Sequence, residues 1–293
     1  KNVQFAVFSI DEALALRKAK IKNEILVFSK LQKNNIELAY KENIILNLSS
    51  FDDMEHIESF YLKNKVSPKY HLKFDTGMTR LGFDLNDAEA IYESLSESLH
   101  PYIEGVYTHF ATADEGDLSY AKKQLSDFKI VVRKVESFGL KFKFIHCSNS
   151  GAVLNLEKSY FNMVRVGMLL YGALPSNEVI DNIGIKPVMS FCGSIVNVRK
   201  VKKNTPVSYG GVYKTASDTN IAVIQTGFAD GFPRPWFENG YVIYNGQKFK
   251  IAGRVCMDQL MIDFGNVVPE LGDDVLFFGE NQIGHLPVEL IAD

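Results

Sequence analysis

Residues 103–147 decide the fold, because they contain one complete strand–helix–strand unit. The apolar run IEGVYTHF (Ile103–Phe110) precedes the segment LSYAKKQLSDFKIVVRKVESF (Leu118–Phe138), and beyond Gly139 follows a second apolar run, FKFIHC (Phe142–Cys147). In the middle segment, apolar residues recur four, three, four and three positions apart, as on one face of a helix: Ala121, Leu125, Phe128, Val132 and Val135. Gly139 is placed to end that helix. Strands joined through a helix are parallel, so the unit predicts a parallel α/β sheet.

The same rhythm extends through the first part of the chain. The apolar, β-branched runs number seven: Phe5–Ser9, Glu24–Ser29, Asn43–Leu48, Tyr70–Asp75, Ile103–Phe110, Phe142–Cys147 and Met163–Tyr171. Helix starts are indicated by Ser9 with Glu12, a capping box, and by Asn86 with Glu89. A (β/α)8 barrel closes with eight strands. The chain begins at Lys1 and is strand-like by Phe5, so we expect either an open doubly wound sheet or a barrel whose first βα unit is absent.

After Gly172 the pattern changes to short β-rich runs separated by Gly, Asn and Pro, with no long helical stretch. Asn245-Gly246 between two such runs predicts a tight hairpin. We therefore expect two domains, an α/β barrel over residues 1–183 and a mostly-β domain over residues 184–293.

Composition excludes several classes of partner. The 293 residues include 32 Lys plus Arg and 35 Asp plus Glu, a net charge of −3, with 46% hydrophobic residues. This balance gives no basic excess for nucleic acid or an anionic membrane. Three widely spaced cysteines predict neither a disulfide framework nor a metal site, and the chain shows neither a transmembrane run nor an export signal. We expect a cytoplasmic protein with a small-molecule partner.

Polar residues gather at the predicted C-terminal ends of the strands, where a βα barrel carries its reactive groups. The candidates are Lys73, Asp75, Arg80, His109, His146, Asn149, Ser150, Arg165 and Gly167. Singly, each has a structural interpretation: a hydrogen-bonded histidine, an ion-paired cation, a helix cap. Strand ends of one barrel face a common mouth, however, and cations beside a Ser-rich turn suit an anion such as a phosphate. The chain has neither GxGxxG nor GxxxxGK[ST], which disfavours a dinucleotide fold or a P-loop.

The β-rich part contributes three further motifs: Val207–Tyr213 with Tyr209 between glycines, Gly227–Gly231, and Gly253–Gln259 with Met257 and Asp258. On spacing alone, each is interpreted as a turn.

These motifs, in this order, closely resemble those of the alanine racemases, pyridoxal 5′-phosphate enzymes that pair a (β/α)8 barrel with a C-terminal β domain. The resemblance covers the chain from the helix at Asp11–Arg17 to Gly253–Gln259 through several long motifs in register, including KFDTGMTRLG (Lys73–Gly82) and YTHFATAD (Tyr107–Asp114). It implies racemisation of L- and D-alanine by two bases, supply of D-alanine for peptidoglycan, and a homodimer with shared active sites.

The resemblance also implies a role for each matching residue. Tyr209 would be one acid–base group, reaching into the partner subunit's site. Arg165 would contact the pyridine nitrogen with His146 behind it. Ser150, with Asn149 and the backbone at Gly167 and Met168, would bind the phosphate, and His109 would lie against the cofactor ring. Arg80 would hold the cofactor hydroxyl and the substrate carboxylate, Lys73 would be carbamylated, and Met257 and Asp258 would line the substrate pocket.

The sequence departs from the family pattern at three places. The family's Schiff-base lysine ends the first barrel strand, which would precede Phe5, and a C-terminal tyrosine would follow Asp293. We therefore expect an incomplete form, inactive as a 293-residue polypeptide. Phe228 stands where many relatives carry a tyrosine near the site entrance.

Three other interpretations remain open. A racemase of the same fold could act on a larger or basic amino acid. A non-enzymatic pyridoxal-phosphate carrier is disfavoured by the β domain, which the small single-domain relatives lack. A degenerate paralogue is disfavoured because the other site motifs are retained.

Overall fold

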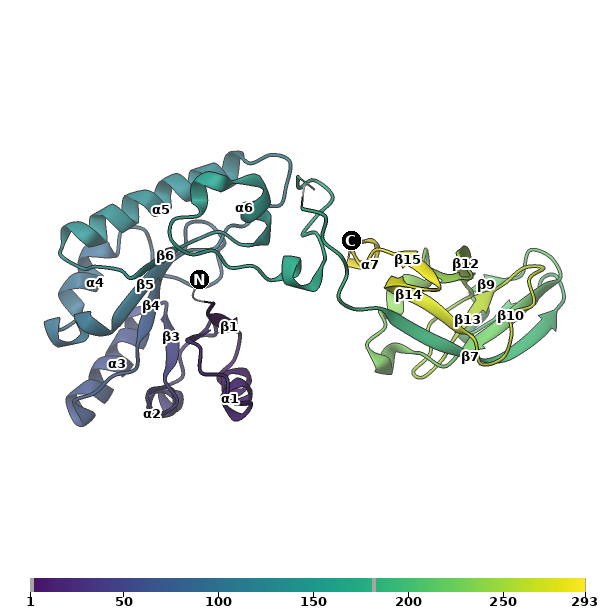
Figure 1. Cartoon of the computed structure of the whole chain (residues 1–293), viewed down its shortest axis with the longest axis horizontal. Helices are drawn as coiled ribbons and strands as arrows, with labels where there is room; N and C mark the ends of the chain where they lie inside the picture. Colours follow the sequence, from purple (N-terminus) through teal and green to yellow (C-terminus); the bar gives the residue numbers. More distant parts are fainter. Residues whose placement is uncertain (1–2, 181–182, 293) are drawn as a thin grey trace. The chain divides into compact units, whose positions relative to one another are not determined.

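The computed structural model describes residues 3–180 and 183–292 and divides the chain into two compact units (Figure 1). The first unit comprises Lys1–Gly167 with Glu178–Asp181, and the second comprises Met168–Asn177 with Asn182–Asp293.

A sheet of six parallel strands forms the first unit, in the order β1-β2-β3-β4-β5-β6. The strands are β1 (Phe5–Val7), β2 (Ile25–Val27), β3 (Ile44–Leu48), β4 (Tyr70–Lys73), β5 (Ile103–Tyr107) and β6 (Phe144–His146). Because consecutive strands are parallel neighbours, their C-terminal ends lie along one edge of the sheet. The predicted parallel α/β architecture of this part of the chain is confirmed.

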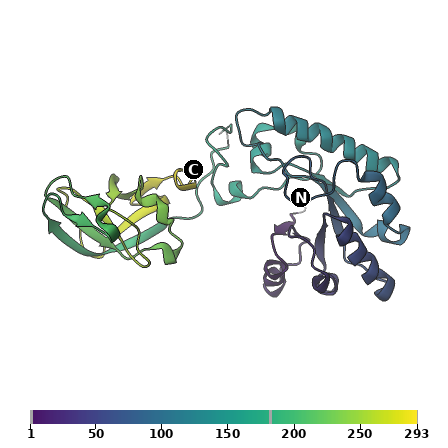
Figure 2. The same cartoon turned by 180° about the vertical axis from the view of Figure 1, so that it is seen from behind.

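Helices alternate with these strands and lie along the outer side of the sheet, as Figures 1 and 2 show for α1 to α5. The helices are α1 (Ile10–Lys18), α2 (Ile36–Lys41), α3 (Phe51–Asn64), α4 (Ala88–Ser94), α5 (Ser119–Ser137) and α6 (Ser150–Asn155). The predicted stripe of α5 is buried in the core of this unit. The capping box of α1 is also confirmed, because Ser9 and Glu12 each bond the other's backbone N–H.

Two predictions for this part of the chain are wrong. Asn86 does not cap α4; its N–H donates to Asp84 Oδ1 (2.9 Å) in a turn, and the N-cap position is Asp87. The seventh run is not a strand: Met163 makes one isolated parallel bridge to His146, and a 3-10 helix follows over Met168–Tyr171. Several apolar residues of that run are exposed, including Val164, Leu170 and Tyr171. The apolar composition of the run therefore does not mean that it is buried in a sheet.

The second unit is an antiparallel β structure. Its strands are β7 (Phe191–Val201), β8 (Pro206–Val207), β9 (Tyr213–Lys214), β10 (Thr219–Ile224), β11 (Tyr241–Tyr244), β12 (Gln247–Ile251), β13 (Leu260–Asp263), β14 (Asp274–Asn281) and β15 (Gly284–Leu286), followed by helix α7 (Glu289–Ala292). Seven of them form a sheet in the order β11-β12-β13-β10-β7-β14-β15, and a further pairing of β11 with β14 closes the first six of these strands into a barrel. The barrel encloses an apolar core that includes Phe232, Ile262 and Phe277.

The hairpin predicted at Asn245-Gly246 joins β11 and β12, and both residues have positive φ (47° and 74°), as a type I′ turn requires. The mostly-β character of this part is thus confirmed, while the boundary near residue 184 stays a prediction. Among the described helices, none has the length and apolar character needed to cross a bilayer.

Candidate active site

Strands β4, β5 and β6 bring three predicted or neighbouring site residues side by side. In the sheet register, Lys73 pairs with Tyr107 and Tyr107 pairs with His146. The Tyr107 ring is 1% exposed and stacks on the His146 ring, with centroids 4.8 Å apart and planes 4° from parallel. The Lys73 ammonium lies 5.6 Å from the same tyrosine ring. Adjacent strand ends therefore place an amine, a phenol ring and an imidazole in one row, as the barrel interpretation requires.

Arg165 contacts two members of this row, His146 and Tyr107. Its Nη1 donates to His146 Nδ1 (2.7 Å), and its Nη2 donates to the carbonyls of Thr108 (2.7 Å) and Cys147 (3.1 Å). A longer contact joins Nη2 to His109 Nδ1 (3.3 Å), and the guanidinium carbon lies 5.3 Å from the Tyr107 ring centroid. The side chain is part-buried, and no carboxylate among the described residues forms an ion pair with it. Arg165 is thus a cation oriented by neutral groups.

The environment of Arg165 is electropositive. Burial, with Arg80 and Arg165 nearby, lowers the pKa of Lys73 to about 8. Burial and the charges of Arg165, Arg80 and Lys73 lower the pKa of His109 to about 3, so its imidazole is neutral at physiological pH. Burial also lowers the pKa of Arg165, while leaving it a cation, since arginine does not lose its proton in proteins. Such a site favours a negatively charged or electron-rich ligand.

Asp75 shapes the loop that carries Arg80. Its Oδ1 accepts hydrogen bonds from the backbone N–H groups of Gly77, Met78 and Thr79 (2.8, 2.8 and 3.1 Å), and its Oδ2 accepts from Arg80 N–H (2.9 Å). Burial by itself would raise the pKa of Asp75, but these four bonds lower it overall. Asp75 is therefore bound to backbone N–H groups and does not pair with Arg165, and the Arg80 side chain is exposed.

The Ser148-Asn149-Ser150 turn opens helix α6. Asn149 is its N-cap and its Oδ1 accepts from Ala152 N–H (3.0 Å), so the structural role considered for this turn is present. The Ser150 hydroxyl accepts from Gly167 N–H (3.0 Å), which places these two predicted phosphate ligands together. A Cβ on Gly167 would meet no atom within 4 Å, so the space above it is open.

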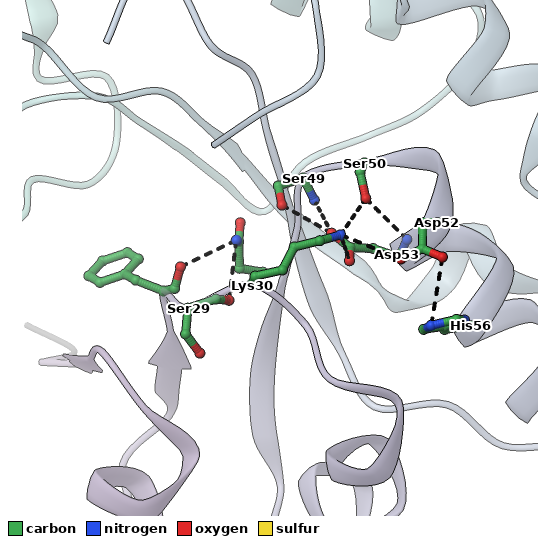
Figure 3. A network of polar contacts seen from close by, with 9 residues as sticks. Ser29, Lys30, Ser49, Ser50, Asp52, Asp53 and His56 are labelled. Carbon is green, nitrogen blue, oxygen red and sulfur yellow. Dashed lines mark hydrogen bonds and ion pairs between the residues drawn. The ribbon is translucent and has the colours of Figure 1, made fainter. Parts of the chain in front are cut away.

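A second polar network lies at the ends of β2 and β3 (Figure 3). The Lys30 ammonium pairs with the fully buried Asp53 of α3, whose Oδ2 accepts from the backbone N–H (2.8 Å) and hydroxyl (3.0 Å) of Ser49. Asn47 Nδ2 donates to the carbonyl of Phe28 (3.3 Å), and Asn47 Oδ1 accepts from the Tyr107 hydroxyl (2.9 Å). The network thus fixes the loops after two strands and binds the Tyr107 hydroxyl through Asn47.

The candidates of the second unit are exposed. Tyr209 is 65% and Met257 58% exposed, and Asp258 is exposed as well. Three loops meet here: Phe228 N–H donates to the Cys256 carbonyl (3.0 Å), Ala229 N–H to the Met257 carbonyl (2.9 Å), and the Ser208 hydroxyl to the Arg254 carbonyl (2.6 Å). Met168 begins the 3-10 helix Met168–Tyr171 of the same unit. The motifs separated along the chain by up to 50 residues therefore form one surface, which we call the Tyr209 surface (residues 208–211, 227–231 and 253–258).

Sequence reasoning missed several residues that shape the site: His71, Tyr107 as a stacking partner, and the Lys30–Asp53 pair. His71 is fully buried and its Nδ1 lies 2.9 Å from His146 Nε2. A signal was present, because His71 and Lys73 alternate in β4 and Asp75 continues this spacing just beyond the strand. Polar residues at period two on a buried strand indicate an inward-facing polar row. Lys30 and Asp53 are 23 positions apart in sequence and carry no such pattern.

Comparisons with known proteins agree with this geometry. The family model for the alanine racemase N-terminal domain matches residues 2–175, and that for the C-terminal domain matches residues 188–293. An alanine racemase of Desulforamulus reducens is 37% identical, over 99% of this chain and 78% of the relative, and one of Methanococcus maripaludis is 36% identical, over 98% and 77%.

Solved structures give the same result. An alanine racemase of Clostridium difficile 630 has a TM-score of 0.88 and 32% identity, over 99% of this chain and 76% of the other. The alanine racemase of Bacillus anthracis, solved with bound L-Ala-P, has a TM-score of 0.86 and 34% identity, over 97% and 74%. Both domains and the whole described fold thus match one group of enzymes, and the chain belongs to the alanine racemase family.

Proposed function

We propose that this protein is a pyridoxal 5′-phosphate-dependent racemase that interconverts L- and D-alanine and supplies D-alanine for cell-wall peptidoglycan. The single observation that carries the proposal is Arg165, a cation held by His146 and two carbonyls with no carboxylate partner among the described residues. Its Nε–H and one Nη1–H make no hydrogen bond there, so they can donate to a ligand.

The residues around Arg165 fit the cofactor. Arg165 would donate to the ring nitrogen, and the neutral His109 would lie against the ring. Ser150, Asn149 and the backbone at Gly167 and Met168 would bind the phosphate. Arg80 would hold the ring hydroxyl and the substrate carboxylate. Two cationic side chains, Arg80 and Arg165, suit a dianionic phosphate and a carboxylate.

When bound, pyridoxal phosphate withdraws electrons from Cα of the amino acid, which makes the α-proton removable. The chain's own residues would position the ligand and transfer the proton at Cα. Because arginine keeps its proton, Arg165 would leave the ring nitrogen unprotonated and thereby weaken electron withdrawal, which suppresses competing reactions. The Tyr209 hydroxyl, reaching the partner subunit's site, would remove or return the proton on one face of Cα. Met257 and Asp258, beside Tyr209, would line the substrate pocket, so the active form would be a homodimer.

Lys73 would carry a carbamate. Its pKa, lowered by burial to about 8, leaves part of the amine neutral near neutral pH, and the neutral amine can attack carbon dioxide. The new N–C bond forms as the nitrogen loses one proton, and the product is an anion beside Arg80 and Arg165. We expect a carbamate resonance after addition of ¹³C-bicarbonate that Lys73→Arg abolishes; equal signals in both proteins would contradict this assignment.

The function is tested by following the interconversion of L- and D-alanine by the protein as its gene encodes it, with pyridoxal phosphate added. We expect racemisation that Tyr209→Phe slows by roughly 10²- to 10⁴-fold, the usual contribution of one acid–base group. Activity toward a basic amino acid and none toward alanine would contradict the proposed substrate. A polypeptide limited to residues 1–293 is expected not to racemise alanine, because no lysine in it matches the family's Schiff-base position.

A further inference from the structure

A chain of three side chains runs from Arg165 into the buried sheet of the first unit. Arg165 Nη1 contacts His146 Nδ1 (2.7 Å), and His146 Nε2 contacts His71 Nδ1 (2.9 Å). Both imidazoles are fully buried. No acidic side chain takes part in these contacts.

The protons of this chain can be assigned by elimination. A guanidinium only donates, so His146 Nδ1 must be the acceptor and carry no proton. A neutral imidazole then has its proton on Nε2, and this N–H donates to His71 Nδ1. His71 in turn carries its proton on Nε2, and that atom is buried with no hydrogen-bond partner among the described residues. Burial lowers the pKa of His71 to about 3 and that of His146 well below its usual value, which agrees with two neutral rings.

The surroundings of His71 make a polar residue there costly. Its ring lies against β5 and β6: it is 5.9 Å from the Phe144 ring, and a Cβ on Gly105 would come within 2.8 Å of its Cε1 and Nε2. An apolar side chain would fill this space without leaving an N–H unsatisfied. Within the described parts of the chain, the one hydrogen bond of His71 is the one it accepts from His146.

We propose that His71 is a positioning residue for the ring-nitrogen site. By accepting from His146 Nε2–H, it fixes the orientation of the His146 ring so that Nδ1 faces Arg165. It also makes Nδ1 a better acceptor, as the outer partners of metal-bound histidines do. Arg165 is thereby held with its remaining N–H groups toward the ligand. The inference rests on the proposed function for the identity of that ligand, but the hydrogen-bond chain is a property of the protein alone.

The first test uses the protein without ligand and with ¹⁵N-labelled histidine. A scalar coupling between His146 Nε2 and His71 Nδ1 reports the hydrogen bond directly in the unsubstituted protein. We expect this coupling, with His146 protonated on Nε2. His146 protonated on Nδ1, or an absent coupling, would overturn the proposal even if every variant failed to fold.

Two matched variants separate positioning from packing. His71→Leu keeps bulk but removes the acceptor, whereas His71→Asn offers its Oδ1 in place of Nδ1. We expect the His146 Nδ1 resonance to move toward that of an unbonded ring nitrogen in His71→Leu and to recover in His71→Asn. Identical His146 resonances in a folded His71→Leu protein would contradict the role of His71.

A binding measurement connects the chain to the ligand. The probe is 4-deoxypyridoxine 5′-phosphate, which lacks the aldehyde and needs no lysine, compared with its analogue carrying C–H in place of the ring nitrogen. His71→Leu should weaken the first about threefold to tenfold, the effect of one hydrogen bond, and leave the second unchanged. Equal weakening of both would contradict positioning. If neither probe bound but the coupling were present, the proposed cofactor function would fail while the chain His71–His146–Arg165 would stand.

Discussion

The candidate residues of the first unit and those of the Tyr209 surface differ in how the fold holds them. In the first unit, Lys73, Tyr107 and His146 lie on adjacent strand ends, and Arg165 binds His146 from the segment that follows α6. On the Tyr209 surface, the loops are joined by backbone hydrogen bonds, but Tyr209 and Met257 project with 65% and 58% of their surface exposed. The first region resembles a core in which hydrogen bonds orient His146 and Arg165 before a ligand arrives. In the second region, hydrogen bonds fix the backbone of the loops while the side chains of Tyr209 and Met257 are exposed to solvent.

This difference predicts opposite mutational behaviour. Substitutions in the row around Tyr107 should change folding stability, because they remove buried contacts. Substitutions of the exposed side chains should change activity with little change in stability.

The largest effect is expected for Tyr107→Ala, because it removes a buried ring that stacks on His146 and accepts a neighbouring cation on its face. Truncation of a buried aromatic ring costs about 3–5 kcal/mol of unfolding free energy. Tyr107→Phe, the matched control, removes only the bond to Asn47 and should cost about 1–3 kcal/mol. Urea denaturation of both proteins measures these values. A loss below about 1 kcal/mol for Tyr107→Ala would contradict the description of this region as a core.

Acid should destabilise the first unit before its carboxylates titrate. The folded-state pKa values of His71 and His109 are about 3, below the ordinary value of 6.5, and that of His146 is lowered as well. Between pH 6.5 and pH 3 the unfolded chain therefore binds more protons than the folded one, so the free energy of unfolding is highest above pH 6.5 and falls with pH. Denaturation midpoints at pH 7 and pH 5 measure the slope, which His109→Gln should reduce. An unchanged slope in that variant would show that His109 does not contribute.

A smaller and local effect is expected at Asp75, whose carboxylate holds four backbone N–H groups in place. Asp75→Ala should cost about 1–3 kcal/mol and speed hydrogen exchange at residues 77–80. Asp75→Asn can keep Oδ1 as acceptor for the first three amides but replaces Oδ2, so only the Arg80 amide should lose protection. Equal exchange at all four amides in both variants would contradict the assignment of separate oxygens.

The smallest change in stability is expected for Tyr209→Phe. Its side chain is mostly exposed, so we expect less than about 0.5 kcal/mol of change in unfolding free energy. The same variant is the one expected to slow racemisation most, so the two measurements on one protein separate activity from folding. A large loss of stability would show that the Tyr209 side chain makes contacts that stabilise the fold, which would contradict this description of the Tyr209 surface.

Much of the fold could be predicted from sequence periodicity, because the helical spacing of apolar residues and the alternation of short strands with turns are both local patterns. The stripe of α5 and the Asn245-Gly246 hairpin needed only spacing and turn chemistry, and both are present. The prediction of a strand over Met163–Tyr171 is wrong, because its apolar residues have the pattern of a buried strand although several of them are exposed. Hydrophobicity alone cannot distinguish a sheet strand from an exposed apolar segment.

The site was predictable as a set of strand-end residues but not as a network. The proximity of Lys73 to His146 follows from parallel strands ending at one edge, whereas Arg165 reaches His146 from a segment that is not a strand. His71 and His146 are 75 positions apart in the sequence, and Lys30 and Asp53 are 23 positions apart. Their contacts depend on side-chain geometry, which no local sequence pattern encodes.

The most direct test of the central claim is the protonation state of a bound ring nitrogen. The measurement uses 4-deoxypyridoxine 5′-phosphate labelled with ¹⁵N in the ring and follows that nitrogen by NMR when the probe binds. If Arg165 donates to it, the bound nitrogen will appear unprotonated and hydrogen-bonded at neutral pH, and Arg165→Leu will abolish that signature. A bound nitrogen that is protonated, or a spectrum that Arg165→Leu leaves unchanged, would contradict the account.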